Sequence, residues 1–116
     1  MRSKLGDKER LAHILDSIEF IEIFCKGVDE KSFRSNYMLQ LAVVKLLEII
    51  GEASSRLSKE LREEYTDIEW PLIIGSRNVL AHEYFSISYD IVWEAVQNDL
   101  PKLKRNLQKI IEQRFS

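Results

Sequence analysis

The chain has 116 residues, of which 45% are hydrophobic, and this suffices for one domain with a single buried core. Its four glycines and two prolines are too few for the many turns of an all-β fold. The net charge of −2 does not indicate a strongly basic nucleic-acid binder. We therefore expect a single domain over residues 1–116 with mainly helical structure.

The lone cysteine and the N-terminus bear on where the protein works. Cys25 has no second cysteine to pair with, which excludes an internal disulfide and a cysteine-based metal cluster and fits a reducing cytoplasm. The opening "MRSKLGDKER" lacks the apolar segment of a signal peptide. No apolar run approaches the roughly 20 residues of a membrane span. We expect a soluble, cytoplasmic protein that does not enter a membrane.

The first predicted helix runs from about Asp7 to Gly27, where a glycine suits the helix C-terminus. Apolar residues recur in it at steps of three and four, the period of an amphipathic helix. This stripe consists of Leu11, Ile14, Leu15, Ile18, Ile21 and Cys25. His13 lies off the stripe, so we expect it at the surface rather than in a site.

A second helix is predicted from Ser32 to about Leu57. Its middle, "MLQLAVVKLLEII", is apolar nearly all round, which is typical of a helix that lies at the centre of a bundle or faces both a core and a partner. Glu48 and Glu52 interrupt this run four residues apart, on one helical row. The small residues of "GEASS", which follow, would let another helix come close.

The remaining helices are predicted from their start and stop signals. A capping-box pattern at residues 66–69 competes with Pro71, which fits a first helical turn, so we expect a helix from Trp70–Pro71 to His82 or Tyr84. Ser88 is a suitable N-cap for the next helix, and Asp99 with Pro101 predicts a break before the last one. The sum is an all-α, up-and-down bundle of four to five helices.

The stretch "SRNVLAHEYF", residues 76–85, carries an unusual set of polar residues on a mostly apolar helix. Asn78 and His82 are four residues apart and share one helical face, whereas Arg77 and Tyr84 are seven apart and share the neighbouring face. Arg77 and His82 lie about 140° apart around the helix, a gap that a long arginine side chain partly bridges. One helix could therefore present all four side chains along a broad ridge.

These residue types suit the cleavage of a phosphodiester without a metal or cofactor. The guanidinium of Arg77 is a planar fork of donors that fits phosphate, His82 can move a proton near neutral pH, and Asn78 can orient an oxygen. RNA supplies its own nucleophile in the 2′-hydroxyl, so such a site would favour RNA over DNA. No histidine pair has the spacing of a zinc site, and no glycine-flanked serine elbow is present.

Structural interpretations of the same residues stay open. Arg77 and His82 could cap carbonyls at the helix end, and Tyr84 could be a core ring with its hydroxyl at the surface. Glu48 and Glu52 could hold Arg77 from the second predicted helix, or Glu52 could simply pair with Arg56 on the surface.

The segment "RNVLAHEY" resembles the R-x4-H-x-Y pattern of the HepT-like toxins of the HEPN superfamily. The flanks "LLEIIGEASSRLS", "WPLIIGSRN" and "DIVWEAVQNDLPKLK" also resemble that family, so the similarity covers residues 11–111. The resemblance implies an up-and-down helical bundle that forms a homodimer with the motif near its interface. It also implies a metal-independent endoribonuclease, the toxin of a type II toxin–antitoxin pair.

The resemblance assigns roles to individual residues. It implies that Arg77 and His82 are catalytic, that Asn78 assists, and that Tyr84 is the hydroxyl to which a minimal nucleotidyltransferase antitoxin adds AMP. Phosphates on Tyr84 would then lie beside Arg77 and compete with RNA. Glu83 departs from the small residue expected between His82 and Tyr84, and its carboxylate would repel RNA if it faced the cleft.

Two further points concern partners. The basic segment Lys102–Arg114 could extend an RNA-binding groove. The alternative to a nuclease is a non-catalytic module whose polar ridge binds a nucleotidyltransferase or a nucleotide, and a third possibility is a purely structural helical domain. Cleavage of RNA by the isolated protein separates the first from the other two.

Overall fold

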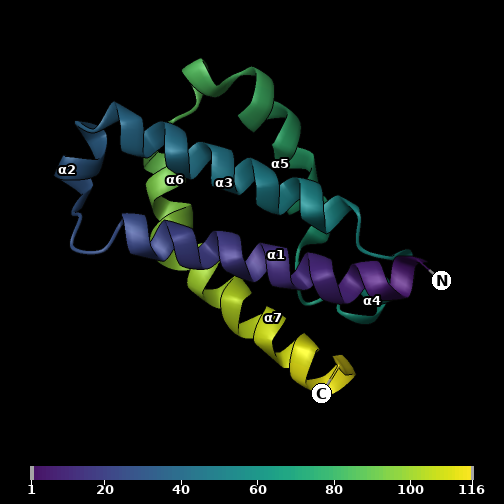
Figure 1. Cartoon of the computed structure of the whole chain (residues 1–116). Helices are drawn as coiled ribbons and strands as arrows, with labels where there is room; N and C mark the ends of the chain where they lie inside the picture. Colours follow the sequence, from purple (N-terminus) through teal and green to yellow (C-terminus); the bar gives the residue numbers. More distant parts are fainter. Residues whose placement is uncertain (1, 116) are drawn as a thin grey trace.

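Figure 1 shows a computed structural model that describes residues 2–115, with side chains described for residues 6–115. The described chain is helical and contains no strand, which confirms the all-α prediction. The elements are α1 (Arg2–Phe24), α2 (Glu30–Arg34), α3 (Tyr37–Ser55), α4 (Lys59–Glu64), α5 (Trp70–His82), the 3-10 turn η1 (Tyr84–Ser86), α6 (Tyr89–Glu94), the π-helical segment η2 (Ala95–Asp99) and α7 (Leu100–Phe115).

Helices α1 and α3 lie side by side at the centre of the bundle, as the apolar composition of α3 predicts (Figure 1). Helix α5 packs on α3, and α7 packs on α1 at the opposite side of the molecule. The predicted stripe of α1 is buried in this core except for Leu15, which is partly buried. No helix within residues 2–115 is long and apolar enough to cross a membrane.

The start and end of α1 differ from the prediction. The helix begins at Arg2 rather than near Asp7 and ends at Phe24. Asp7 does not cap it, because its buried carboxylate accepts hydrogen bonds from the Ser58 backbone N–H (2.8 Å) and hydroxyl (2.6 Å) at the start of α4. Gly27 lies in the turn beyond α1 with φ of +75°, a backbone conformation that favours glycine.

The single helix predicted from Ser32 to Leu57 is in fact two helices, α2 and α3. Asn36 ends the continuity because its side chain caps α3 by accepting from the Leu39 N–H at 3.0 Å. The buried Gln40 amide donates to the carbonyls of Phe33 (2.8 Å) and Arg34 (2.9 Å), which satisfies the end of α2. The apolar pattern alone did not reveal this break.

Helix α5 starts at Trp70 with Pro71 in its first turn, so the proline signal was correct and no side-chain cap forms. The helix ends at His82. Glu83 is its C-cap, and Tyr84 belongs to the separate turn η1. The prediction that Arg77 and Tyr84 share one helical face is therefore wrong, because the α-helical geometry stops before Tyr84.

The break predicted at Asp99–Pro101 is also wrong. Helices α6 and α7 are joined without interruption by η2, in which the Leu100 N–H bonds to the Ala95 carbonyl. Pro101 has no N–H to donate, and its ring clashes with the carbonyl four residues earlier in a regular helix. The wider π turn tolerates the missing N–H of Pro101 and leaves room for its ring, so the helix continues.

Gly51 sets the distance between α3 and α5. A Cβ atom at this position would lie 2.9 Å from the Ile73 carbonyl oxygen and 3.1 Å from the Cβ of Arg77. Both contacts are with backbone or with the base of a side chain, so neither can move aside easily. The prediction that the small residues of "GEASS", which form the last turns of α3, admit a close helix is confirmed, and the helix they admit carries Arg77.

Candidate active site

A polar cavity of about 310 Å³ lies between α3 and α5. Its lining consists of Glu48 and Glu52 from α3 and of Arg77, Asn78, Ala81 and His82 from α5. We call it the motif cavity. Within a single chain, it brings together Arg77, Asn78 and His82, the three residues that the sequence assigned to catalysis, despite the angle that separates Arg77 from His82 on an ideal helix.

Arg77 is held by Glu52. Its Nη1 donates to Glu52 Oε1 at 3.4 Å, and the second oxygen of the same carboxylate accepts from Arg56 Nε at 3.2 Å. Both interpretations of Glu52 are thus correct at once: it pairs with Arg56 on the surface and it contacts Arg77. The side chains are 38% (Arg77) and 50% (Glu52) exposed, so the pair is open to solvent and to an incoming phosphate.

Glu48 lines the motif cavity but forms its ion pair with Lys45, at 3.5 Å between Lys45 Nζ and Glu48 Oε1. Its predicted role in holding Arg77 falls to Glu52 instead. Two carboxylates and one guanidinium therefore face the same space. Arg77 therefore makes one long contact with Glu52 and keeps its other donors for a ligand.

Asn78 and His82 are exposed, one turn apart near the C-terminal end of α5. Glu83, the C-cap, donates its backbone N–H to the Val79 carbonyl at 2.8 Å. The Glu83 side chain is exposed and is not among the side chains that line the motif cavity. The expected repulsion of RNA by a carboxylate inside the cleft therefore does not arise from Glu83 in this cavity.

Tyr84 lines a second cavity, of about 320 Å³, on the other side of Glu48 and Ala81. We call it the tyrosine cavity. Its lining consists of Tyr37, Leu41, Val44, Lys45, Glu48, Leu80, Ala81 and Tyr84. The Tyr84 ring is 43% exposed and meets Phe85 edge-on, with ring centroids 5.9 Å apart, so it is not a core ring. The two cavities share Glu48 and Ala81 and thus adjoin.

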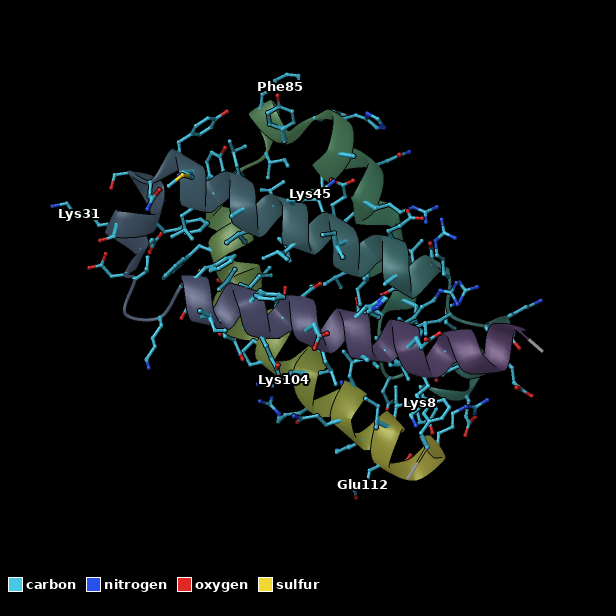
Figure 2. All side chains as sticks on the ribbon, in the orientation of Figure 1. Lys8, Lys31, Lys45, Phe85, Lys104 and Glu112 are labelled. Atoms are coloured by element: carbon cyan, nitrogen blue, oxygen red, sulfur yellow. The ribbon has the colours of Figure 1, made fainter. Side chains whose placement is uncertain are left out.

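The basic segment Lys102–Arg114 lies on α7, across α1 and α3 from the motif cavity (Figure 2). Lys104 donates to Glu22 at 2.9 Å, and this hydrogen bond raises the pKa of the lysine. Arg114 pairs with Glu60 at 3.2 Å and with Glu64. Two charges of the segment thus fasten α7 to the bundle, and its part in RNA binding stays a prediction.

His13 is exposed on α1, as predicted, and lines a different and wider cavity between α1 and α3. Over residues 2–115, no group of three or more His, Cys, Asp or Glu side chains is arranged to hold a metal ion. Sequence reasoning missed Tyr37 and Lys45, which the packing of α5 on α3 brings beside the motif. Their only sequence signal was a lysine and a tyrosine within an apolar helix.

Comparison with known proteins adds evidence that is independent of this geometry. The family model described as "Ribonuclease HepT-like" matches residues 14–110. "Putative RNase MJ1380" of Methanocaldococcus jannaschii is 39% identical over 91% of this chain and 97% of its own length. "Putative RNase TTE0752" of Caldanaerobacter subterraneus subsp. tengcongensis is 39% identical, with coverages of 88% and 91%. "Probable ribonuclease HepT" of Thermococcus cleftensis is 33% identical, with coverages of 92% and 97%. No solved structure matches the chain.

Proposed function

The chain belongs to the ribonuclease HepT-like family, and we propose that it is a metal-independent endoribonuclease with its active site in the motif cavity. The observation that carries this proposal is the convergence of Arg77, Asn78 and His82 on one polar cavity beside a carboxylate that orients the arginine. The wider cavity between α1 and α3 also holds a histidine, His13, with Arg56 and Glu52, but there the acid and the arginine lie on one helix, whereas Glu52 reaches Arg77 on the neighbouring helix.

The proposed reaction uses the 2′-hydroxyl of the RNA. His82 accepts the proton of that 2′-hydroxyl. At the same time, the 2′-oxygen attacks the adjacent phosphorus, and the bond from the phosphorus to the 5′-oxygen breaks. Arg77 donates to the phosphate oxygens, where negative charge develops in the transition state, and Asn78 orients one of them. The products are a 2′,3′-cyclic phosphate and a 5′-hydroxyl, whose oxygen takes up a proton as it leaves.

We further propose that the active form is a homodimer. Helices α1 and α3 expose large apolar side chains, namely Phe20, Ile23, Phe24, Met38 and Ile49. Two of these, Phe20 and Ile49, line the wider cavity between α1 and α3, which shares Glu52 with the motif cavity. Water contact with such a surface is unfavourable, and a second copy would cover it. A dimer would also place two copies of His82 near one cleft, so that one histidine accepts the proton of the nucleophile and the other protonates the leaving oxygen.

The toxin role and its silencing belong to the same proposal. A minimal nucleotidyltransferase antitoxin would transfer AMP to the exposed hydroxyl of Tyr84 in the cytoplasm. Intact-mass measurement of the protein made with and without a minimal nucleotidyltransferase tests this step. We expect one added AMP group that is absent from Tyr84→Phe, and an unchanged mass with an active nucleotidyltransferase present would contradict it.

The chemistry is tested with one sequence made as RNA and as DNA. We expect the unmodified protein to cut the RNA, to leave the DNA intact, and to lose cleavage at any position that carries a single 2′-deoxy nucleotide. Cleavage of that 2′-deoxy position would contradict attack by the 2′-hydroxyl. Binding of RNA without any cleavage would instead favour the non-catalytic binding module.

A further inference from the structure

The tyrosine cavity is a second place where the packing of α5 and η1 on α3 leaves an open space, directly beside the motif cavity. We propose that it is a nucleotide subsite, which binds the nucleotide next to the scissile phosphodiester by stacking its base on tyrosine and pairing its phosphate with Lys45. This inference rests on the proposed function, because it takes the motif cavity as the place where the RNA is cut.

Two tyrosines provide the surface for a base. Tyr37 comes from the first turn of α3 and is 59% exposed, and Tyr84 comes from η1 and is 43% exposed. Leu41, Val44 and Leu80 complete an apolar lining between them. Every base has a flat aromatic face, so stacking on such rings binds single-stranded RNA with little dependence on sequence.

Lys45 provides the charge for a phosphate. Its side chain is 66% exposed, and its contact with Glu48 is long, at 3.5 Å, so the ammonium group is free to take a stronger partner. Figure 2 shows Lys45 on the side of α3 that faces α5, below Phe85. A phosphate here would lie one cavity away from Arg77, with only Glu48 and Ala81 common to the two spaces.

This arrangement gives the modification of Tyr84 a direct consequence. An AMP group on that hydroxyl is itself a nucleotide attached within the subsite. It would occupy the tyrosine cavity and exclude the RNA nucleotide there without having to reach Arg77. AMP on Tyr84 would thus silence the protein by occupying the neighbouring subsite, and not by competing with RNA for Arg77.

The test is the affinity for a short single-stranded RNA, measured by fluorescence anisotropy on unmodified His82→Ala protein so that the RNA stays intact. We expect Tyr37→Leu to weaken binding about tenfold, because base stacking on an aromatic ring is lost, and Tyr37→Phe to leave it unchanged because the ring remains. Lys45→Gln should also weaken binding and reduce its salt dependence, whereas Lys109→Gln, an equal charge change on the distant α7, should not.

The outcomes separate this inference from the proposed function. Equal affinities of Tyr37→Leu, Lys45→Gln and the parent protein would overturn the subsite while leaving cleavage in the motif cavity untouched. Failure of every variant, including the parent, to bind RNA would overturn both proposals. Weakened binding in Tyr37→Leu and Lys45→Gln, with unchanged binding in Tyr37→Phe and Lys109→Gln, supports the subsite.

Discussion

At the scale of single residues, Glu52 is the side chain that contacts Arg77, the proposed phosphate-binding residue. Its carboxylate bridges Arg77 on α5 and Arg56 on its own helix, so it positions one guanidinium without touching the reacting atoms. Exposed ion pairs of this kind contribute about 0–1 kcal/mol, which limits the effect of removing one. We therefore expect Glu52 to act as a positioning residue, whose loss should be visible in the rate of cleavage and not in the fold.

We predict that Glu52→Gln lowers kcat about twofold to fivefold, in keeping with the loss of up to about 1 kcal/mol of orientation. KM should stay equal or fall, because the substitution also removes a negative charge from the RNA path. Glu63→Gln, which removes the same charge from a more exposed pair with Lys59 on α4, is the control and should leave both constants unchanged. Equal kcat values for Glu52→Gln and wild type, with equal melting temperatures, would remove the positioning role.

Asp29 gives a prediction for pH. Its carboxylate caps α2 by accepting from the Ser32 N–H at 2.8 Å, and this hydrogen bond lowers its pKa below the ordinary 3.8. A lowered pKa in the folded state means that the stabilisation is present above the ordinary value and is lost as pH falls through the folded one. Thermal melts should therefore show a higher melting temperature for wild type than for Asp29→Asn at pH 7. The difference between the two melting temperatures should close in strong acid. A difference independent of pH would contradict this account.

At the scale of elements, the contact of α3 with α5 decides the shape of both cavities. We predict that Gly51→Ala destabilises the protein by about 1–3 kcal/mol, because the added methyl group forces α5 away from α3. This shift of α5 moves Arg77 relative to Glu52, so the rate of RNA cleavage should fall together with the stability. Chemical denaturation and the cleavage rate measure the two effects.

Gly75→Ala is the control for that substitution. Gly75 lies within α5, and a Cβ there would meet nothing within 4 Å. Alanine in an open helical position stabilises by about 0.5–1 kcal/mol relative to glycine. The two glycine substitutions should thus change the free energy of unfolding in opposite directions. A stabilised Gly51→Ala would show that this contact does not limit the distance between α3 and α5.

Helical spacing was sufficient to predict the fold class, the buried stripe of α1 and the convergence of Arg77, Asn78 and His82. It failed where one side chain redirects the chain. Asn36 divides α2 from α3. The end of α5 was predicted at His82 or Tyr84, and the helix ends at His82. The tyrosine cavity also could not be predicted, because it depends on how closely α5 approaches α3, which Gly51 sets through contacts distant in sequence.

At the scale of the whole molecule, the exposed apolar surface of α1 and α3 predicts self-association. We expect the wild-type protein to have the mass of a dimer by light scattering and Phe20→Glu to have that of a monomer, because a buried charge without a partner opposes the interface. Phe20 is 50% exposed in the single chain, so the substitution should not prevent folding. Ile91→Glu, at a 70% exposed residue of α6, is the control and should remain dimeric.

The phosphodiester chemistry of the motif cavity is the central claim, and the chain offers a matched pair of histidines to test it. Both histidines of the chain are exposed, but His82 lines that cavity, whereas His13 lines the wider cavity between α1 and α3. The most direct measurement is the rate of RNA cleavage, in the presence of a metal chelator, by wild type, His82→Ala and His13→Ala. We predict a loss of about a hundredfold or more for His82→Ala, as expected for removal of a general base, and a wild-type rate for His13→Ala. Equal rates for His82→Ala and wild type would contradict the assignment of the active site.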